Sequence, residues 1–424
     1  MVSRFVGAQP GIDRHVNADL HLLPNGLTIA ADPIPDAETV ALGLYAKVGS
    51  RSEPERLTGL AHLVEHMVFK GAGGRDTRAL AEAIEDVGGS LNAWTARDQT
   101  VFHGRALARD LPLLAELISD LVRAPHFKEE HLEREKQVIL SELGECVDSP
   151  DDLVHDHLFE AAFADQAIGR PVLGTETSVH AIARTDCFDW LREQLVPSRL
   201  ILAASGKVDP EALLLLCERL LGDMETRPEP QVRPASFTGG IRNDRRSFEQ
   251  AHWCLAFEGV PAGDEQMPAL SMFVQALGGG TSSRLFQELR EERGLAYSVY
   301  AWAQGFADVG IVGIGCAAEQ PRAAESVQLA REVLARTAAG LTDAELQRAR
   351  AQMEAGLVMG LETAQGRADQ LARSIEVFGR ILSPGELLEQ IRAVTLSDAR
   401  AAGQRLLEGP VAMASVGARL ALAA

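Results

Sequence analysis

Residues 60–69 read Leu-Ala-His-Leu-Val-Glu-His-Met-Val-Phe, and this stretch is the most informative part of the chain. On an α-helix, positions i, i+3 and i+4 lie on one face, so His62, Glu65 and His66 would project from the same side. Imidazoles are ligands that Zn²⁺ prefers, and a neighbouring carboxylate can take a proton from a water at the metal. The order His-x-x-Glu-His occurs among zinc-peptidase signatures. The stretch therefore predicts a helix that carries part of a zinc site, with an ordinary surface helix as the alternative.

A zinc site of this kind needs a third protein ligand. Residues 129–143 have helical apolar spacing, and Glu135 and Glu142 lie seven positions apart within them, so both glutamates share one face. His-x-x-Glu-His followed downstream by these glutamates resembles the pitrilysin/insulinase family of zinc metallopeptidases. Within that family the chain is similar to the bacterial branch related to the mitochondrial processing peptidase. The resemblance continues through residues 148–152 and 168–175 and covers nearly the whole chain.

The resemblance implies a role for each residue of the motif. His62, His66 and Glu142 would bind one Zn²⁺ per chain, and Glu65 would be the general base. Glu135 would orient a ligand histidine, as metal-bound imidazoles usually require. For Glu135, an ordinary solvated helix glutamate is the alternative.

The composition agrees with a globular enzyme. The length of 424 residues predicts two domains, and the hydrophobic content of 46% is typical of a globular protein. The chain has no apolar run of membrane-spanning length. Its five cysteines are scattered and form no Cys-x-x-Cys, so we expect free thiols in a reducing, cytoplasmic compartment. The net charge of −19 disfavours nucleic-acid and anionic-membrane binding and would favour cationic peptides, although solubility explains it equally well.

A proline-rich segment divides the chain. Residues 226–240 carry three closely spaced prolines without apolar periodicity, which predicts an extended linker between domains at 1–225 and 241–424. The two parts look duplicated, because the strand-like residues 40–48 and 252–260 are each followed by an apolar helix.

The second copy lacks the metal-binding groups of the first. In a hand alignment the apolar pattern is kept, but none of the four predicted metal-site residues has a counterpart able to bind a metal. The pairs are His62 with Val274, His66 with Gly278, Glu135 with Ala349 and Glu142 with Gly356. We therefore expect a catalytic N-terminal domain and a C-terminal domain without metal.

The C-terminal copy carries a different candidate pair. Residues 283–299 predict a helix, a stop at Gly294 and a strand. Within them Arg290 and Tyr297 match an arginine–tyrosine pair that the resembled family brings to the zinc site from a metal-free half. A guanidinium and a phenol can donate hydrogen bonds to a developing oxyanion. The alternative is an ordinary helix arginine and a buried strand tyrosine.

A candidate peptide-binding segment follows the glycine turn at residues 88–89. Residues 90–102 are strand-like, and in the resembled family the matching strand lies at a sheet edge beside the zinc, where a peptide can add as a further strand. Asn92 and Ala93 are the matching positions, with a plain sheet strand as the alternative. The glycine-rich residues 278–283 lack the Gly-Lys-Ser/Thr ending of a phosphate loop, which argues against nucleotide binding.

The resemblance implies the fold and the activity together. The expected fold is α+β, with two duplicated domains that each have a mostly antiparallel sheet with helices on one face. Two such chains would form a clamshell around a chamber, as a homodimer or as a heterodimer with a metal-free homologue. The expected activity is zinc-dependent endoproteolysis of short or unfolded peptides, with neither nucleic acid nor membrane as partner. A non-catalytic core or assembly subunit, or a peptide-binding member of the same fold, is the alternative.

Overall fold

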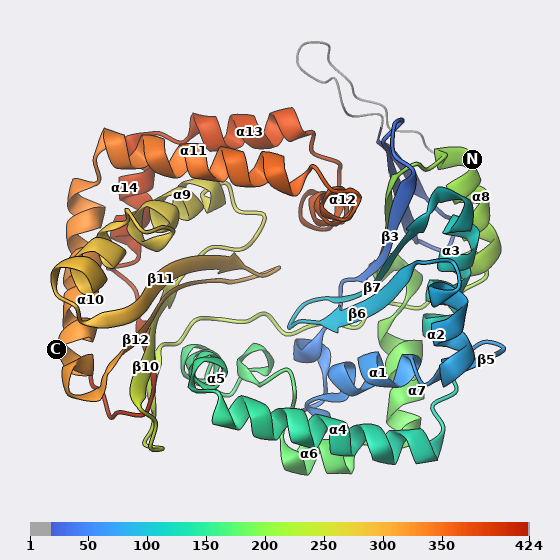
Figure 1. Ribbon diagram of the computed structural model, residues 1–424, viewed down its shortest axis with the longest axis horizontal. Coiled ribbons are helices and arrows are strands. Elements are labelled where there is room, and N and C mark those ends of the chain that lie inside the picture. Colours follow the sequence, from blue (N-terminus) through green and yellow to red (C-terminus); the bar gives the residue numbers. More distant parts are fainter. Residues whose placement is uncertain (1–17, 423–424) are drawn as a thin grey trace. The chain divides into compact units, whose positions relative to one another are not determined.

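The computed structural model describes residues 18–422, and these form two compact units that are each built around one sheet (Figure 1). The first unit contains residues up to Leu143, Val172–Val232 and Val358–Gly385. The second contains Gly144–Pro171, Arg233–Leu357 and the chain from Glu386 onward. Each unit therefore draws on both halves of the sequence.

The first sheet has six strands in the order β1-β2-β8-β3-β7-β6, and only β2 and β8 run parallel. Its strands are β1 (Asp19–Leu22), β2 (Thr28–Pro33), β3 (Thr39–Ala46), β6 (Ser90–Thr95), β7 (Thr100–Leu107) and β8 (Leu200–Gly206), beside a small ribbon of β4 (Gly71–Ala72) and β5 (Arg75–Asp76). The helices of this unit are α1 (Leu60–Val68), α2 (Thr77–Glu85), α3 (Leu111–Arg123), most of α4 (Glu129–Asp148), α6 (Glu176–Ala181), α7 (Arg184–Gln194), α8 (Pro210–Leu221) and α12 (Ala364–Phe378).

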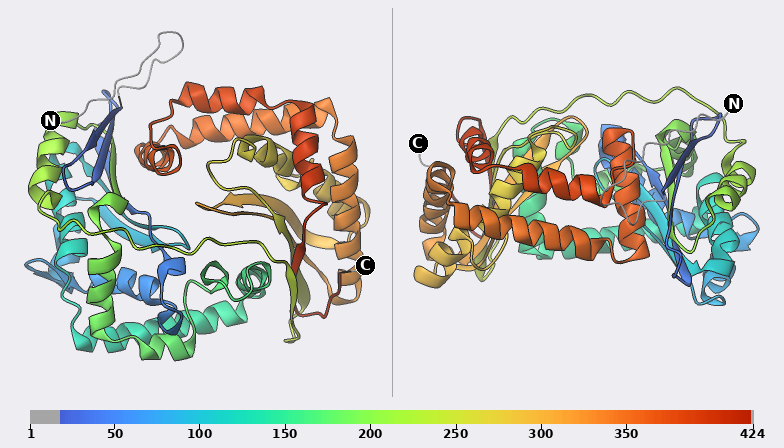
Figure 2. Two further views of the ribbon diagram at one scale, coloured as in Figure 1. Left: turned by 180° about the vertical axis from the view of Figure 1, so that it is seen from behind. Right: turned by 90° about the horizontal axis from the view of Figure 1, so that it is seen from above.

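The alternation of side chains along the strands gives this sheet two buried faces. In β3, Leu42 and Leu44 point into the main core with α1, α3 and α8, whereas Tyr45 points to the opposite face. Helix α12 covers that opposite face, and Figure 2 shows it across the sheet from α3 and α8. The continuous apolar run of β3 thus reflects a strand that is covered on both sides.

Helix α12 comes from the C-terminal half of the sequence, and polar as well as apolar contacts fix it to the first sheet. Its apolar side chains contact Tyr45 and its neighbours on the sheet. Arg367 of α12 forms a bidentate ion pair with the buried Asp32, with Nε–Oδ2 and Nη2–Oδ1 distances of 2.6 and 2.9 Å. The Tyr45 hydroxyl donates to Asp369 at 2.5 Å, and the pKa of this phenol is raised by its burial and by the aspartate. These contacts make α12 an integral part of the first unit.

Glu376 of α12 provides a pH-dependent contribution to stability. Burial raises the pKa of its carboxyl from 4.5 to about 7, and Gln99 donates to it at 2.7 Å. Because this pKa is higher in the folded chain, the contribution is complete below pH 4.5 and is lost as the pH rises through about 7. Glu376→Gln should therefore raise the free energy of unfolding at pH 8 by up to about 3 kcal/mol and leave it unchanged near pH 4.

Urea unfolding of Glu376→Gln across this pH range measures the effect. The exposed Glu362, which precedes α12, offers a control with the same change of charge. Glu362→Gln should follow the wild-type pH profile. Equal profiles for the Glu376 variant and the wild type would show that this carboxyl titrates normally.

The second sheet has five strands in the order β11-β12-β10-β13-β9, and only β13 and β9 run parallel. One face packs against α9 and α10, and the other packs against α5, which comes from the N-terminal half of the sequence (Figure 1). The strands are β9 (Gly240–Asp244), β10 (Gln250–Glu258), β11 (Ala296–Gly305), β12 (Gly310–Glu319) and β13 (Val411–Val416). The helices are α5 (Pro150–Ala162), α9 (Met267–Gly278), α10 (Ala323–Gly340), α14 (Leu396–Arg405) and most of α11 (Asp343–Gly360) and of α13 (Pro384–Ala393).

The structure confirms the predicted α+β fold with two mostly antiparallel sheets. Helices were expected on one face of each sheet only, but α12 covers the second face of the first sheet and α5 covers the second face of the second sheet, each coming from the other half of the sequence. The predicted parts 1–225 and 241–424 differ from the compact units, because each unit takes a helix from the other part. Residues 225–239, which span most of the predicted linker at 226–240, form neither helix nor strand. No helix among the described residues is long and apolar enough to cross a membrane.

The prediction of one strand over residues 90–102 is wrong. The chain reverses after Thr95, where the Ala96 N–H donates to the Gln99 carbonyl at 2.7 Å, and β6 and β7 pair as a hairpin. The polar residues Arg97 and Asp98 form the turn between them. Alternation continues on both sides of such a short turn, so the pattern alone did not separate the strands.

Candidate metal centre

Helix α1 presents the three residues of the motif on its less buried side. Leu63, Val64 and Met67 of this helix are buried in the main core. His62 and His66 therefore lie together on the other side, with their ring centroids 4.6 Å apart. The amphipathic spacing predicted from the sequence thus decides which side chains are available to a ligand.

The third member of the cluster comes from α4. Glu142 Oε2 lies 3.9 Å from His62 Nε2 and 3.8 Å from His66 Nε2. One ligand atom of each residue lies within 4.8 Å of the other two, and all three residues are partly exposed. Among the described residues this is the one group of His, Cys, Asp and Glu with such geometry. The structure thus brings together the three predicted ligands.

The chemistry of this cluster fits a zinc ion. Ligand atoms about 2.1 Å from a tetrahedral zinc lie about 3.4 Å apart, so the observed separations need only a small contraction. Burial lowers the pKa of His62 to about 4, and the neighbouring His66 acts in the same direction. His62 is therefore a neutral imidazole near pH 7, which is the form that binds metals. Because the cluster is partly exposed, it leaves room for a water or substrate as a fourth ligand.

Glu135 contacts Nδ1 of His66, the ring nitrogen that does not face Glu142. Its Oε2 lies 3.2 Å from His66 Nδ1, and its Oε1 lies 2.9 Å from Lys70 Nζ. Glu135 is only 7% exposed, so the solvated alternative does not describe it. A carboxylate on Nδ1 fixes the tautomer that offers Nε2 to a metal. The sequence interpretation missed Lys70, because nothing in a linear pattern shows which lysine meets a buried glutamate.

Glu65 lies beside the cluster without belonging to it. Its Oε2 is buried and has no hydrogen-bond partner among the described residues. Burial raises the pKa of this carboxyl, and the charge of Glu142 adds to the effect, although the hydroxyl of Thr95 and the charge of His66 oppose it. A carboxylate with a raised pKa and an unused oxygen is suited to accept a proton from water.

Comparison with known proteins identifies the family. The model of the insulinase family, peptidase family M16, matches residues 28–176, and the model of the M16 inactive domain matches residues 181–353. The chain belongs to peptidase family M16. The predicted resemblance is thereby confirmed, and the "inactive domain" description agrees with a second copy that lacks metal ligands.

Relatives of similar length extend the comparison. A protein of Streptomyces coelicolor named as an uncharacterized zinc protease is 35% identical and covers 91% of this chain and 86% of its own length. A Mycobacterium tuberculosis protein with the same description is 36% identical and covers 91% of this chain and 90% of its own length. A protease from Helicobacter pylori shares the fold, with a TM-score of 0.87 at 20% identity and coverage of 94% and 99% of the two chains.

In this M16 chain, β6 forms an edge of the first sheet and packs beside α1. Asn92 is exposed and Ala93 is buried, and Asn92 Oδ1 accepts the N–H of Ala93 at 2.9 Å. Among the described strands β6 pairs only with β7, so its other edge can accept a peptide in an extended conformation. The part of Asn92 and Ala93 in substrate binding stays a prediction.

Arg290 and Tyr297 lie close together in the second unit. Arg290 is in a π-helical turn (Phe286–Glu292), with its guanidinium carbon 6.0 Å from the centroid of the Tyr297 ring. Gly294 has a φ of +55°, which ends the helix as predicted. Tyr297 lies at a β-bulge between Ala296 and Ser298, and the residue is 71% exposed, so the alternative of a buried strand tyrosine does not describe it. Both polar groups are therefore available to a ligand, and their catalytic role stays a prediction.

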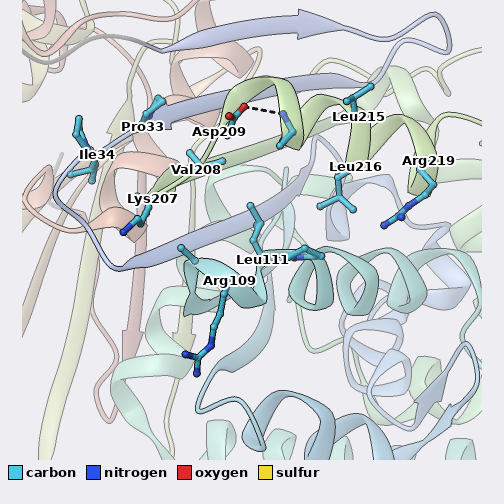
Figure 3. A pocket seen from close by; sticks show the side chains of 15 residues that line it. Pro33, Ile34, Arg109, Leu111, Lys207, Val208, Asp209, Leu215, Leu216 and Arg219 are labelled. Carbon is cyan, nitrogen blue, oxygen red and sulfur yellow. Dashed lines mark hydrogen bonds between the residues drawn. The ribbon is translucent and has the colours of Figure 1, made fainter.

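A separate pocket of about 920 Å³ opens at one end of the first sheet, and Figure 3 shows the side chains around it. None of the metal-centre residues lines this pocket. Its lining is mostly apolar and comes from the ends of β2 and β8 and the beginnings of α3 and α8; it includes Ile34, Leu111, Val208, Leu215 and Leu216. The pocket is thus a feature apart from the proposed chemistry.

The different positions of Glu142 and Glu135 give a prediction for zinc binding. Glu142→Ala removes a ligand and should abolish zinc retention during dialysis against a weak chelator. Glu135→Ala leaves three ligands and should weaken zinc binding roughly 10–100-fold, which is the usual effect of losing such a partner. Competition with a chromophoric chelator measures both affinities. Full zinc affinity in Glu142→Ala, together with zinc loss in Glu135→Ala, would require that the two roles be exchanged.

Proposed function

We propose that the chain is a zinc-dependent metalloendopeptidase that cleaves short or unfolded peptides, with one zinc ion per chain. The observation that carries the proposal is the cluster of His62, His66 and Glu142 with the unused carboxylate oxygen of Glu65 beside it. The names of the relatives as zinc proteases support it.

Different groups of the chain have different roles in the proposed hydrolysis. A zinc ion held by the cluster would polarise the scissile carbonyl and lower the pKa of a water. Glu65 takes the proton of the attacking water and passes it to the leaving amine. The free edge of β6 holds the peptide through main-chain hydrogen bonds, which tolerate many sequences. Arg290 and Tyr297 donate hydrogen bonds to the carbonyl oxygen as its charge develops.

We further propose that two chains form a homodimer in which Arg290 and Tyr297 of one protomer complete the zinc site of its partner around a shared chamber. The chain carries both the zinc motif and the arginine–tyrosine pair, so two copies supply two full sets of catalytic groups. A heterodimer with a metal-free homologue is the alternative arrangement. The five cysteines are free, and four of them are buried, which supports the proposed location in the reducing cytoplasm.

A digest of a mixed peptide library tests the activity. The zinc-loaded protein should cleave peptides internally, a strong chelator should stop the cleavage, and added Zn²⁺ should restore it. Mass spectrometry of the products reads the cleavage positions. A protein that binds stoichiometric zinc but leaves every peptide intact would instead be a peptide-binding member, and one that binds no zinc would be a structural subunit.

A further inference from the structure

The segment between β3 and α1, residues 47–59, connects two parts of the proposed site. One end follows the central strand β3, and the other leads into the helix that carries His62. We call residues 47–59 the connecting loop. It contains two short 3₁₀ turns, Ser50–Ser52 and Glu55–Leu57. Its contacts determine where the metal-binding helix begins.

The first part of the connecting loop is attached to the turn after the edge strand β6. The Ser50 N–H donates to the Ala96 carbonyl at 3.0 Å, and the Arg51 N–H donates to the Arg97 carbonyl at 3.0 Å. The Arg51 side chain, which is almost fully buried, also pairs with Asp98 at 3.0 Å. The strand that would bind the peptide is thereby attached to the loop that leads to the metal.

The second part of the loop caps helix α1 through Glu53. This residue is 4% exposed; its Oε2 accepts the N–H of Gly59 at 2.9 Å, and its Oε1 accepts the N–H of Ala61 at 2.7 Å. The N-cap residue of α1 is Gly59, with a φ of +96°, so the cap position itself offers no side chain. Glu53 thus accepts the Ala61 N–H that an N-cap Ser or Asp would otherwise bind, and it also accepts the N–H of the N-cap residue Gly59, as the Glu of a capping box does.

The position of Glu53 matters for the metal for two reasons. His62 directly follows Ala61, so a hydrogen bond that fixes the backbone at Ala61 also fixes the point from which the His62 side chain projects. The first turn of a helix carries partial positive charge, which opposes binding of a divalent cation by a residue in that turn. A buried carboxylate at the same helix end offsets this charge.

We propose that Glu53 is a positioning residue of the metal centre. It fixes His62 relative to the peptide-binding edge and compensates the positive charge of the helix end. This inference rests on the zinc-peptidase function proposed above. Glu53 is not one of the three proposed ligands, so its effect is exerted through His62.

Variants at Glu53 test the proposal against a matched control. Glu53→Ala removes the cap and its charge, whereas Glu53→Gln keeps the size and loses the charge. Asp209 caps α8 in the same unit by accepting the N–H groups of Glu211 and Ala212, at 2.9 and 3.0 Å, and it is no part of the metal centre. Asp209→Ala therefore removes a comparable two-bond cap from a helix without ligands. Unfolding in urea places the three variants on one stability scale.

The main readout is zinc affinity of the folded proteins, measured by chelator competition. Glu53→Ala should bind zinc roughly 10-fold more weakly or worse, as expected when a group that supports a ligand is lost. Glu53→Gln should lie between it and the wild type, and Asp209→Ala should match the wild type. The visible spectrum of the Co²⁺-substituted protein should change in the Glu53 variants only. With saturating zinc, kcat should fall while KM for a peptide changes little.

The outcomes distinguish a failure of this inference from a failure of the proposed function. Wild-type zinc affinity and an unchanged Co²⁺ spectrum in both Glu53 variants would overturn the inference alone. Equal weakening of zinc binding by Asp209→Ala would also overturn it, because the effect would then follow general stability. If Glu53→Ala does not fold, Glu53→Gln decides the question. A wild-type protein that binds no zinc would contradict the proposed function and this inference with it.

Discussion

Glu65→Gln should lower peptide turnover at least ~10²-fold while zinc binding stays nearly normal, since general-base groups typically contribute that much. Glutamine has the same size as glutamate but cannot accept a proton, and Glu65 lies outside the group of predicted ligands. Because one carboxylate oxygen of Glu65 has no hydrogen-bond partner among the described residues, the substitution breaks no contact at that atom. Steady-state kinetics and zinc content of the same preparation measure the two effects together.

An exposed glutamate of the first unit supplies the control. Glu85 lies at the end of α2 and is exposed, so Glu85→Gln makes the same change of charge without affecting the metal centre. It should keep wild-type turnover. Near-normal hydrolysis by Glu65→Gln would remove Glu65 from its proposed role, and loss of zinc from that variant would make Glu65 a ligand.

Two inactive variants should restore activity when they are mixed. One carries Glu65→Gln, and the other carries Arg290→Ala with Tyr297→Phe. If these groups meet across a dimer, each mixed dimer has one site with both defects and one intact site. Random exchange makes half of the dimers mixed, so the mixture should regain about a quarter of the wild-type activity.

The control for this mixing experiment uses two defects of the same half. Glu65→Gln mixed with His62→Ala should stay inactive, because no mixed dimer of that pair has an intact zinc half. Subunit exchange is followed separately with two differently tagged chains. Absence of recovery in mixtures that do exchange would place Arg290 and Tyr297 in the same chain's site or outside catalysis.

The metal centre was predictable because its signal is local. His62, Glu65 and His66 lie within one helical turn, and Glu135 and Glu142 share a face of another helix, so spacing alone groups each set. The contact between α1 and α4, by contrast, joins residues that lie far apart in the sequence. For that step the prediction depended on the family resemblance, and the distances between the three ligand residues agree with it.

The features that sequence analysis missed all depend on contacts between distant residues. Lys70 meets Glu135 across 65 positions of sequence, and the resulting pair has no periodic pattern. Glu53 caps a helix from outside the usual cap position, because Gly59 occupies that position. The bulge at Tyr297 was also absent from the sequence analysis; it leaves this residue exposed, so the alternative of a buried strand tyrosine does not describe it.

The position of α12 in the C-terminal half of the sequence affects when the first unit can finish folding during synthesis. The last strand of the first sheet ends at Gly206, but α12 begins only at Ala364. At typical rates of translation, on the order of ten seconds pass between the synthesis of these two segments. Throughout this interval one apolar face of the nascent sheet is uncovered and Asp32 lacks its arginine partner. The first unit therefore cannot complete its core until the C-terminal half of the chain has been made, and one face of its sheet stays open to water and to non-native contacts until then.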